Sequence, residues 1–235
     1  MGSAINESVS DRRRATLQLI LVPALISLAV TLIRLTGELR HWSAAWFSSG
    51  QGLSGPVSWV IGITWLAIPF GAYFGIRLAA STGKAPRLLR SLPWAVAGVV
   101  VIYVSQFLSQ FIRFIPIKFP ESLIPFWLLI ACAAAIQYLA WPALFKTLLA
   151  YGLSVRLPVV LIYFLAMLGN WGTHYDYVGM PPEFSMPLLP RFLWLAFFPQ
   201  LTLWVGFTIV AGSVAGVIAS AMVRKPAIAT ARATM

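Results

Sequence analysis

Cysteine, histidine and acidic residues are scarce in this chain of 235 residues, which has one cysteine, two histidines and six acids. The single Cys132 lies in the apolar run "IACAAAI". This excludes a disulfide framework and a thiolate zinc site. The chain also has no G-x-S-x-G, Walker or G-x-G-x-x-G motif, so the enzyme and nucleotide-binding classes that these motifs mark are not indicated.

Charge is scarce as well, because only 10% of the residues are charged, whereas 60% are hydrophobic and the mean hydropathy is +0.84. A soluble domain of this length could not cover its surface with so few polar groups. The apolar residues come in long runs without strand-like alternation, which favours helices over an outer-membrane barrel. The sequence therefore predicts an all-α integral membrane protein in contact with the lipid bilayer.

The apolar runs predict a bundle of about six transmembrane helices within residues 15–223, between a basic tail at 1–14 and a second tail at 224–235. The first run is long enough to cross the bilayer and no cleavage site follows it, so we expect it to be retained rather than removed as a signal peptide. We expect a bend at Pro199 in the last span. An alternative merges residues 147–155 into an extended fourth helix. The predicted spans are Thr16–Leu35, Val57–Ile76, Leu92–Ile112, Leu123–Phe145, Leu157–Trp171 and Leu193–Val223.

Basic residues predict the orientation, since they are enriched in cytoplasmic connections. We expect both termini to be cytoplasmic (N-in/C-in), in a bacterial-type inner (plasma) membrane. This topology also accounts for the net charge of +11, so nucleic acid is not expected as a partner. The inner side would hold Arg12, Arg13, Arg14, Arg77, Lys84, Arg87, Arg90, Lys146, Arg156, Arg224, Lys225 and Arg232, and the outer side Arg34, Arg40, Arg113, Lys118 and Arg191.

Two polar stripes have helical spacing: Thr31, Arg34, Glu38 and His41 in the first span, and Tyr103, Gln106, Gln110 and Arg113 in the third. Ionisable and amide groups at membrane depth are costly unless they pair or line a wet cavity. We therefore expect the two stripes to face each other or a shared, outward-facing polar pocket. The candidate ligand-binding residues are Arg34, Glu38, Gln106, Gln110, Arg113, Asn170 and His174. A buried packing network without a ligand is the alternative.

A divalent metal is a further hypothesis for the outer side, and no other cofactor is predicted. Glu38 and His41 are spaced as E-x-x-H, and the motif "HYD" adds His174 and Asp176. Two histidines and two carboxylates suit zinc, iron or manganese. Ordinary salt bridges and hydrogen bonds of the loops are the alternative, because this short spacing is common by chance.

Small residues recur at intervals of four in two spans, at Gly71 and Gly75 and at Gly212, Gly216 and Ser220. Such faces let helix backbones approach closely. They predict packing within the chain or, alternatively, a face for a homodimer or another membrane subunit.

We expect the pocket to bind or pass a small polar or anionic solute, or a lipid headgroup, with the loop at 171–190 as a lid. One alternative is a non-catalytic subunit or assembly factor of a larger membrane complex. Another is a metal-dependent enzyme embedded in the membrane, with its site on the extracytoplasmic side.

Overall fold

The computed structural model describes residues 2–48, 58–82, 86–112, 120–176 and 185–223, with side chains except those of 2–13, 58, 59, 82 and 109–112. These residues form helices, and no strand occurs among them. The prediction of an all-helical protein is confirmed.

Five helical stretches in the described residues are long and apolar enough to cross a membrane. They belong to α1 (Gly2–Leu39), α3 (Leu88–Ile112), α4 (Ile124–Ala140 with the preceding turn η2, Glu121–Leu123), α5 (Pro142–Gly169) and the stretch from α6 (Leu188–Phe192) to α7 (Val205–Met222). A sixth apolar helix, α2 (Ala67–Thr82), has only 16 residues. The chain is therefore an integral membrane protein with five to six helices that could span the bilayer.

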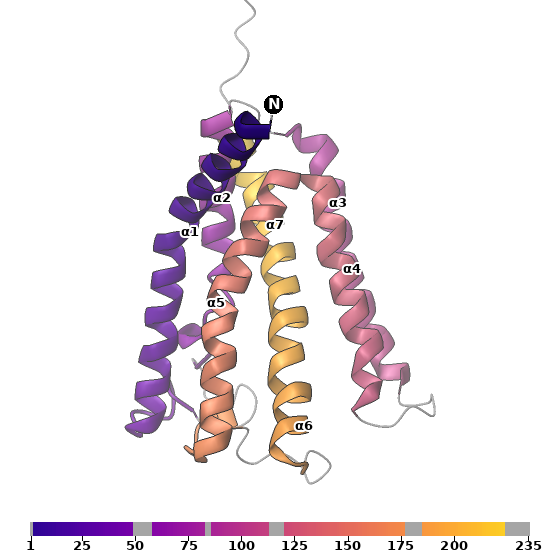
Figure 1. Cartoon of the computed structure of the whole chain (residues 1–235). Coiled ribbons are helices and arrows are strands. Elements are labelled where there is room, and N and C mark those ends of the chain that lie inside the picture. Colours follow the sequence, from indigo (N-terminus) through magenta and orange to yellow (C-terminus); the bar gives the residue numbers. More distant parts are fainter. Residues whose placement is uncertain (1, 49–57, 83–85, 113–119, 177–184, 224–235) are drawn as a thin grey trace, which may run out of the picture.

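The helices lie side by side in one bundle (Figure 1). α1 lies at one edge and packs on α5, whereas α3 and α4 pair at the opposite edge. α7 packs against α2, α3, α4 and α5 and so connects the two halves. The start of α1 and the finish of α7 share one end of the bundle, the upper end in Figure 1. We call the opposite end, where α1, α3 and α5 finish, the lower end.

The fourth and fifth predicted spans meet at Trp141 rather than at a basic loop. Proline disfavours helical geometry in the residue before it, and Trp141, which precedes Pro142, is extended with φ −162° and ψ 98°. α4 therefore ends at Ala140 and α5 continues unbroken to Gly169. Placing Arg156 in a cytoplasmic connection was wrong, because it lies in the middle of this 28-residue helix and is only 4% exposed.

The second predicted span is only partly helical. After a 3-10 turn, η1 (Ser58–Ile61), the chain is irregular from Gly62 to Leu66, and α2 begins at Ala67. Pro69 consequently lies in the first turn of α2, where its missing N–H costs no helical hydrogen bond, instead of kinking a continuous span.

The last span departs from regular α-helix on both sides of Pro199. π-helical turns occupy Leu193–Phe197 (η5) and Gln200–Trp204 (η6), between α6 and α7. Proline cannot donate the backbone hydrogen bond of a regular helix, and π-helical turns occur frequently at functional sites.

The two small-residue faces pack against each other inside the chain. A Cβ atom on Gly71 would overlap the backbone of Gly212, and one on Gly75 would overlap that of Gly216. The close approach of α2 and α7 thus depends on the absence of side chains at these positions. This contact is the one that the intramolecular alternative predicts.

Candidate functional site

A cavity of about 520 Å³ lies between α1, the segment 61–68, α5, the turn η3 (His174–Asp176) and the stretch from η6 into α7. This volume is in the range of small-molecule sites. Most of the lining is apolar. The lining residues are Thr31, Arg34, Ile61, Gly62, Ile63, Thr64, Trp65, Ile68, Arg156, Val159, Tyr163, His174, Tyr175, Gln200, Trp204 and Phe207.

Arg156 is the most deeply placed charge of the cavity. One terminal nitrogen donates to Gln200 Oε1 at 3.1 Å, and the other donates to Thr64 Oγ1 at 3.4 Å. The guanidinium carbon lies 5.2 Å from the centre of the Trp204 ring, within cation–π range. Nε is buried without a hydrogen-bond partner, and Arg156 forms no ion pair with any carboxylate of the described residues.

The partners of Arg156 come from the two places where helix geometry is interrupted. Thr64 lies in the irregular segment before α2, and Gln200 begins the π-helical turn after Pro199. Because both reach a residue in the middle of α5, the irregular segment lies at the depth of the bundle interior. Non-helical backbone is tolerated at such depth where it is covered by protein or lines a cavity.

Glu38 lies near the lower end of α1 and holds together two walls of the cavity. Its carboxylate accepts hydrogen bonds from Arg34 Nε at 3.0 Å and from the backbone N–H of His174 at 2.9 Å. Its oxygens also lie 2.6 and 2.8 Å from His174 Nδ1. The Glu38 side chain is fully buried. We call Arg34, Glu38 and His174 the clamp, because they fasten α1 to the turn η3.

The connection after α5 places His174 in this clamp. Asn170 ends α5 in the left-handed conformation, with φ 48°, and Gly172 also has a positive φ of 71°. The carboxylate of Asp176 then accepts hydrogen bonds from the backbone N–H groups of Gly172 and Thr173 at 2.8 and 2.7 Å. Asp176 therefore shapes the loop that presents His174 to Glu38.

Two groups in the turn η3 have shifted pKa values. Burial lowers the pKa of His174, and the charge of Arg34 acts in the same direction, although the hydrogen bond to Glu38 opposes both. The imidazole is therefore neutral at pH 7, and we assign its proton to Nδ1, which then donates to the Glu38 carboxylate. Burial also raises the pKa of Tyr175, so its phenol stays protonated.

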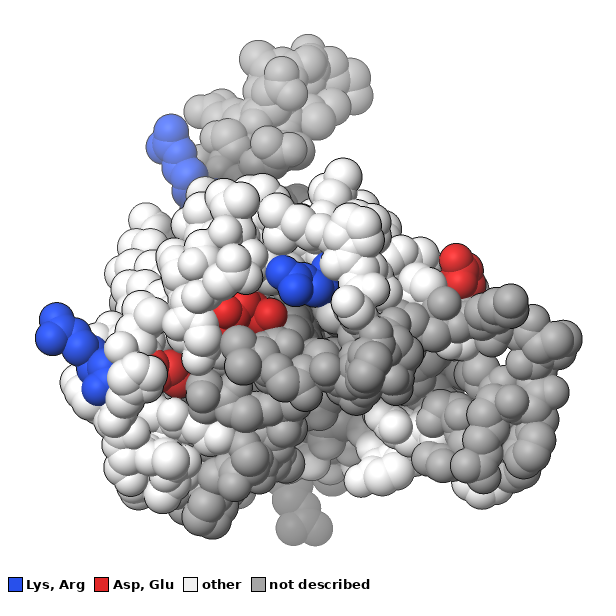
Figure 2. Space-filling view, turned by 90° about the horizontal axis from the view of Figure 1, so that it is seen from below, with Lys and Arg blue, Asp and Glu red and all other residues white. Residues whose placement is uncertain are grey.

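The structure brings together only part of the candidate ligand-binding set. Arg34 and His174 line the cavity, with Glu38 between them. Asn170 is exposed at the end of α5. Charged groups of both signs lie close together near the middle of the lower end (Figure 2).

The third-span stripe does not face the first. α3 packs on α4 and α7, on the far side of the bundle from α1 (Figure 1), and the prediction that the two stripes face each other was wrong. Tyr103 is 72% exposed, and the Gln106 side chain is exposed as well. Arg113 and the side chain of Gln110 lie outside the described residues, as does most of the expected lid, residues 177–184.

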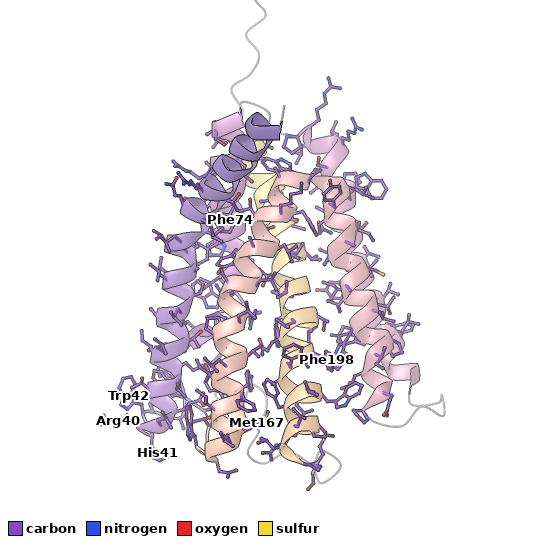
Figure 3. All side chains as sticks on the ribbon, viewed as in Figure 1. Arg40, His41, Trp42, Phe74, Met167 and Phe198 are labelled. Atoms are coloured by element: carbon purple, nitrogen blue, oxygen red, sulfur yellow. The ribbon has the colours of Figure 1, made fainter. Side chains whose placement is uncertain are left out.

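Of the four candidate metal ligands, the structure brings together only Glu38 and His174. α1 ends at Leu39, so His41 does not continue its face, and Figure 3 shows Arg40, His41 and Trp42 pointing away from the bundle. Asp176 is engaged by its own loop. Within the described ranges, no three His, Cys, Asp or Glu side chains are grouped as a metal would require.

No protein-family model, curated protein or solved structure matches the chain. The function is therefore inferred from the geometry of the cavity.

Proposed function

We propose that this membrane protein binds an anionic ligand in the cavity, with Arg156 as the anchor. The observation that carries the proposal is a buried guanidinium with an unpartnered Nε and no carboxylate partner among the described residues. A buried charge without a counter-ion costs several kcal/mol. A bound anion would remove that cost and supply the missing acceptor.

The clamp supports an anchor at Arg156 rather than at Arg34. Arg34 is already paired with Glu38 at 3.0 Å, so its charge is compensated within the protein. Arg156 has only neutral partners, Gln200 and Thr64. An anion entering the cavity therefore gains most from Arg156, and we assign the clamp a structural role in holding the cavity closed at the lower end.

The orientation of the helix bundle in the membrane forms part of the proposal. Arg77, Arg90 and Lys146 lie near the ends of α2, α3 and α5 that face the upper end. Since basic residues favour the cytoplasmic side, we place the upper end in the cytoplasm and the lower end outside, in a plasma membrane. The end of the cavity near His174 would then lie toward the extracytoplasmic side.

Benzoate and benzyl alcohol test the anchor, because they have similar shapes but differ in charge. We expect benzoate, at constant ionic strength, to raise the unfolding temperature of the purified protein. At 100 times its Kd, the ligand should add about 2.7 kcal/mol to the free energy of unfolding. Benzyl alcohol should have less effect. Arg156→Gln should abolish the benzoate effect, whereas Arg40→Gln, at an exposed position, should preserve it. Equal stabilisation of both variants by benzoate would contradict the proposal.

A further inference from the structure

The charges around the cavity leave one positive charge to be neutralised. The cation of Arg34 is offset by the carboxylate of Glu38, and His174 is a neutral donor in the same clamp. Asp176 is bound by the N–H groups of its own loop. Asp176 does not line the cavity, and of the two cations that do, Arg34 and Arg156, only Arg156 lacks a carboxylate partner among the described residues. A ligand with a single negative charge would pair with Arg156, whereas the second charge of a dianion would have no free cation to pair with.

The unpartnered Nε of Arg156 limits the shape of the anionic group. Gln200 and Thr64 each accept from one terminal nitrogen, and the ring of Trp204 lies against the guanidinium. The unpartnered Nε belongs to the remaining edge. A planar carboxylate, or two oxygens of a phosphodiester, can accept two parallel N–H bonds along such an edge.

The apolar part of the lining reaches the outside of the bundle. Trp65 and Ile68 line the cavity, yet 38% of Trp65 and 53% of Ile68 are exposed. They flank the start of α2, next to Thr64, which contacts the middle of α5 through Arg156. At that depth a bundle that spans the membrane is surrounded by hydrocarbon, so this side of the cavity adjoins lipid.

We infer that the ligand is a monoanionic amphiphile taken from the bilayer, with its charged group at Arg156 and its apolar part along Trp65 and Ile68. This inference rests on the proposed function and names its ligand class. Two sources share the chemistry: a free fatty acid with a carboxylate, and a membrane phospholipid with a phosphodiester. Both carry one negative charge on an apolar body, and the experiment separates them.

The full chain in phosphatidylcholine nanodiscs provides the test, with retained lipid counted by native mass spectrometry. Oleate and phosphatidylglycerol are added separately, with oleyl alcohol as the neutral match for oleate and benzoate as the soluble anion. We expect oleate or phosphatidylglycerol to bind with one molecule per chain, at least 10-fold more tightly than oleyl alcohol, because a hydrogen bond to a charged group contributes about a factor of 10 or more. Either should also bind more tightly than benzoate, because benzoate has the charge but buries less apolar surface. Whichever of the two binds identifies the source.

Three variants separate the contributions of charge and apolar contact. Arg156→Gln should weaken amphiphile binding by about 10-fold or more, and Arg156→Lys, which keeps the charge, should weaken it less. Trp65→Ala should weaken binding of the amphiphile but hardly change that of benzoate. Thermal unfolding of each variant checks that it is folded.

Two results would overturn the inference in distinguishable ways. If benzoate binds in a manner that requires Arg156 while oleate and phosphatidylglycerol do not, the ligand is a soluble anion, and the proposed function stands without the amphiphile. If no probe depends on Arg156 in a folded Arg156→Gln variant, the amphiphile and the anion-binding function both fail.

Discussion

The substitution Glu38→Gln tests whether the clamp holds α1 in place. Glutamine has nearly the same shape as glutamate, so the change removes charge and one acceptor with little change in volume. In the wild-type chain the Glu38 carboxylate is fully buried and meets three donors: Arg34 Nε, His174 Nδ1 and the His174 backbone N–H. A glutamine offers one oxygen to these donors, and its amide nitrogen must face at least one of them.

The expected loss follows from these contacts. A hydrogen bond to a charged group contributes about 1.5–3 kcal/mol and a neutral one about 0.5–1.5 kcal/mol, so weakening three of them costs about 3 kcal/mol. Removing one partner of a buried ion pair independently gives about 3–5 kcal/mol. We therefore expect a loss of about 4 kcal/mol, or a fall in unfolding temperature of roughly 8–16 °C for a domain of this size.

Thermal unfolding in detergent, followed by tryptophan fluorescence, measures this loss. Glu121→Gln is the matched control, because Glu121 is exposed in the connection between α3 and α4. It should change stability by less than about 0.5 kcal/mol. Equal stability of the two variants would refute the clamp. Below its unfolding temperature, Glu38→Gln should still be stabilised by benzoate, since Arg156 is unchanged.

Two further perturbations test the loop and the helix packing. The pKa of His174 is lower in the folded state than in the unfolded state, so the unfolded state binds the proton more readily. The free energy of unfolding should therefore fall as pH drops below about 6.5. Thermal unfolding at several pH values should show that this fall is diminished in His174→Gln and unchanged in His41→Gln. Gly71→Val places a side chain against the backbone of Gly212 and should cost more than about 4 kcal/mol or prevent folding. The exposed control Ala80→Val should remain folded in size-exclusion chromatography, and a Gly71→Val variant as stable as this control would contradict the close α2–α7 contact.

The helices were predictable from the sequence because a bilayer requires about 20 consecutive apolar residues for each crossing. Which helices pack against each other was not predictable. The spacing of Tyr103 and Gln106 shows that they share a helix face, but periodicity does not indicate which helix that face meets. Packing decided against the predicted pairing, since α3 lies on α4 and α7.

The clamp was partly predictable and the anchor was not. Arg34 and Glu38 are four residues apart, a spacing that pairs charges on a helix, and His174 was expected at the same end of the bundle. Arg156 was assigned to a loop because basic residues usually mark connections. The signal that could have corrected this was the apolar stretch at 147–155, which continues directly into the fifth span and leaves no room for a polar loop.

The two interruptions of regular helix argue that the cavity is more than a packing defect. The irregular segment before α2 and the π-helical turn after Pro199 both depart from the regular α-helical hydrogen-bond pattern. At membrane depth, non-helical backbone is tolerated where it is covered by protein or lines a cavity. Thr64 from the first and Gln200 from the second converge on Arg156. An apolar residue at 156 would need neither partner and would carry no uncompensated charge. Binding an anion gives a physical reason for all three features together.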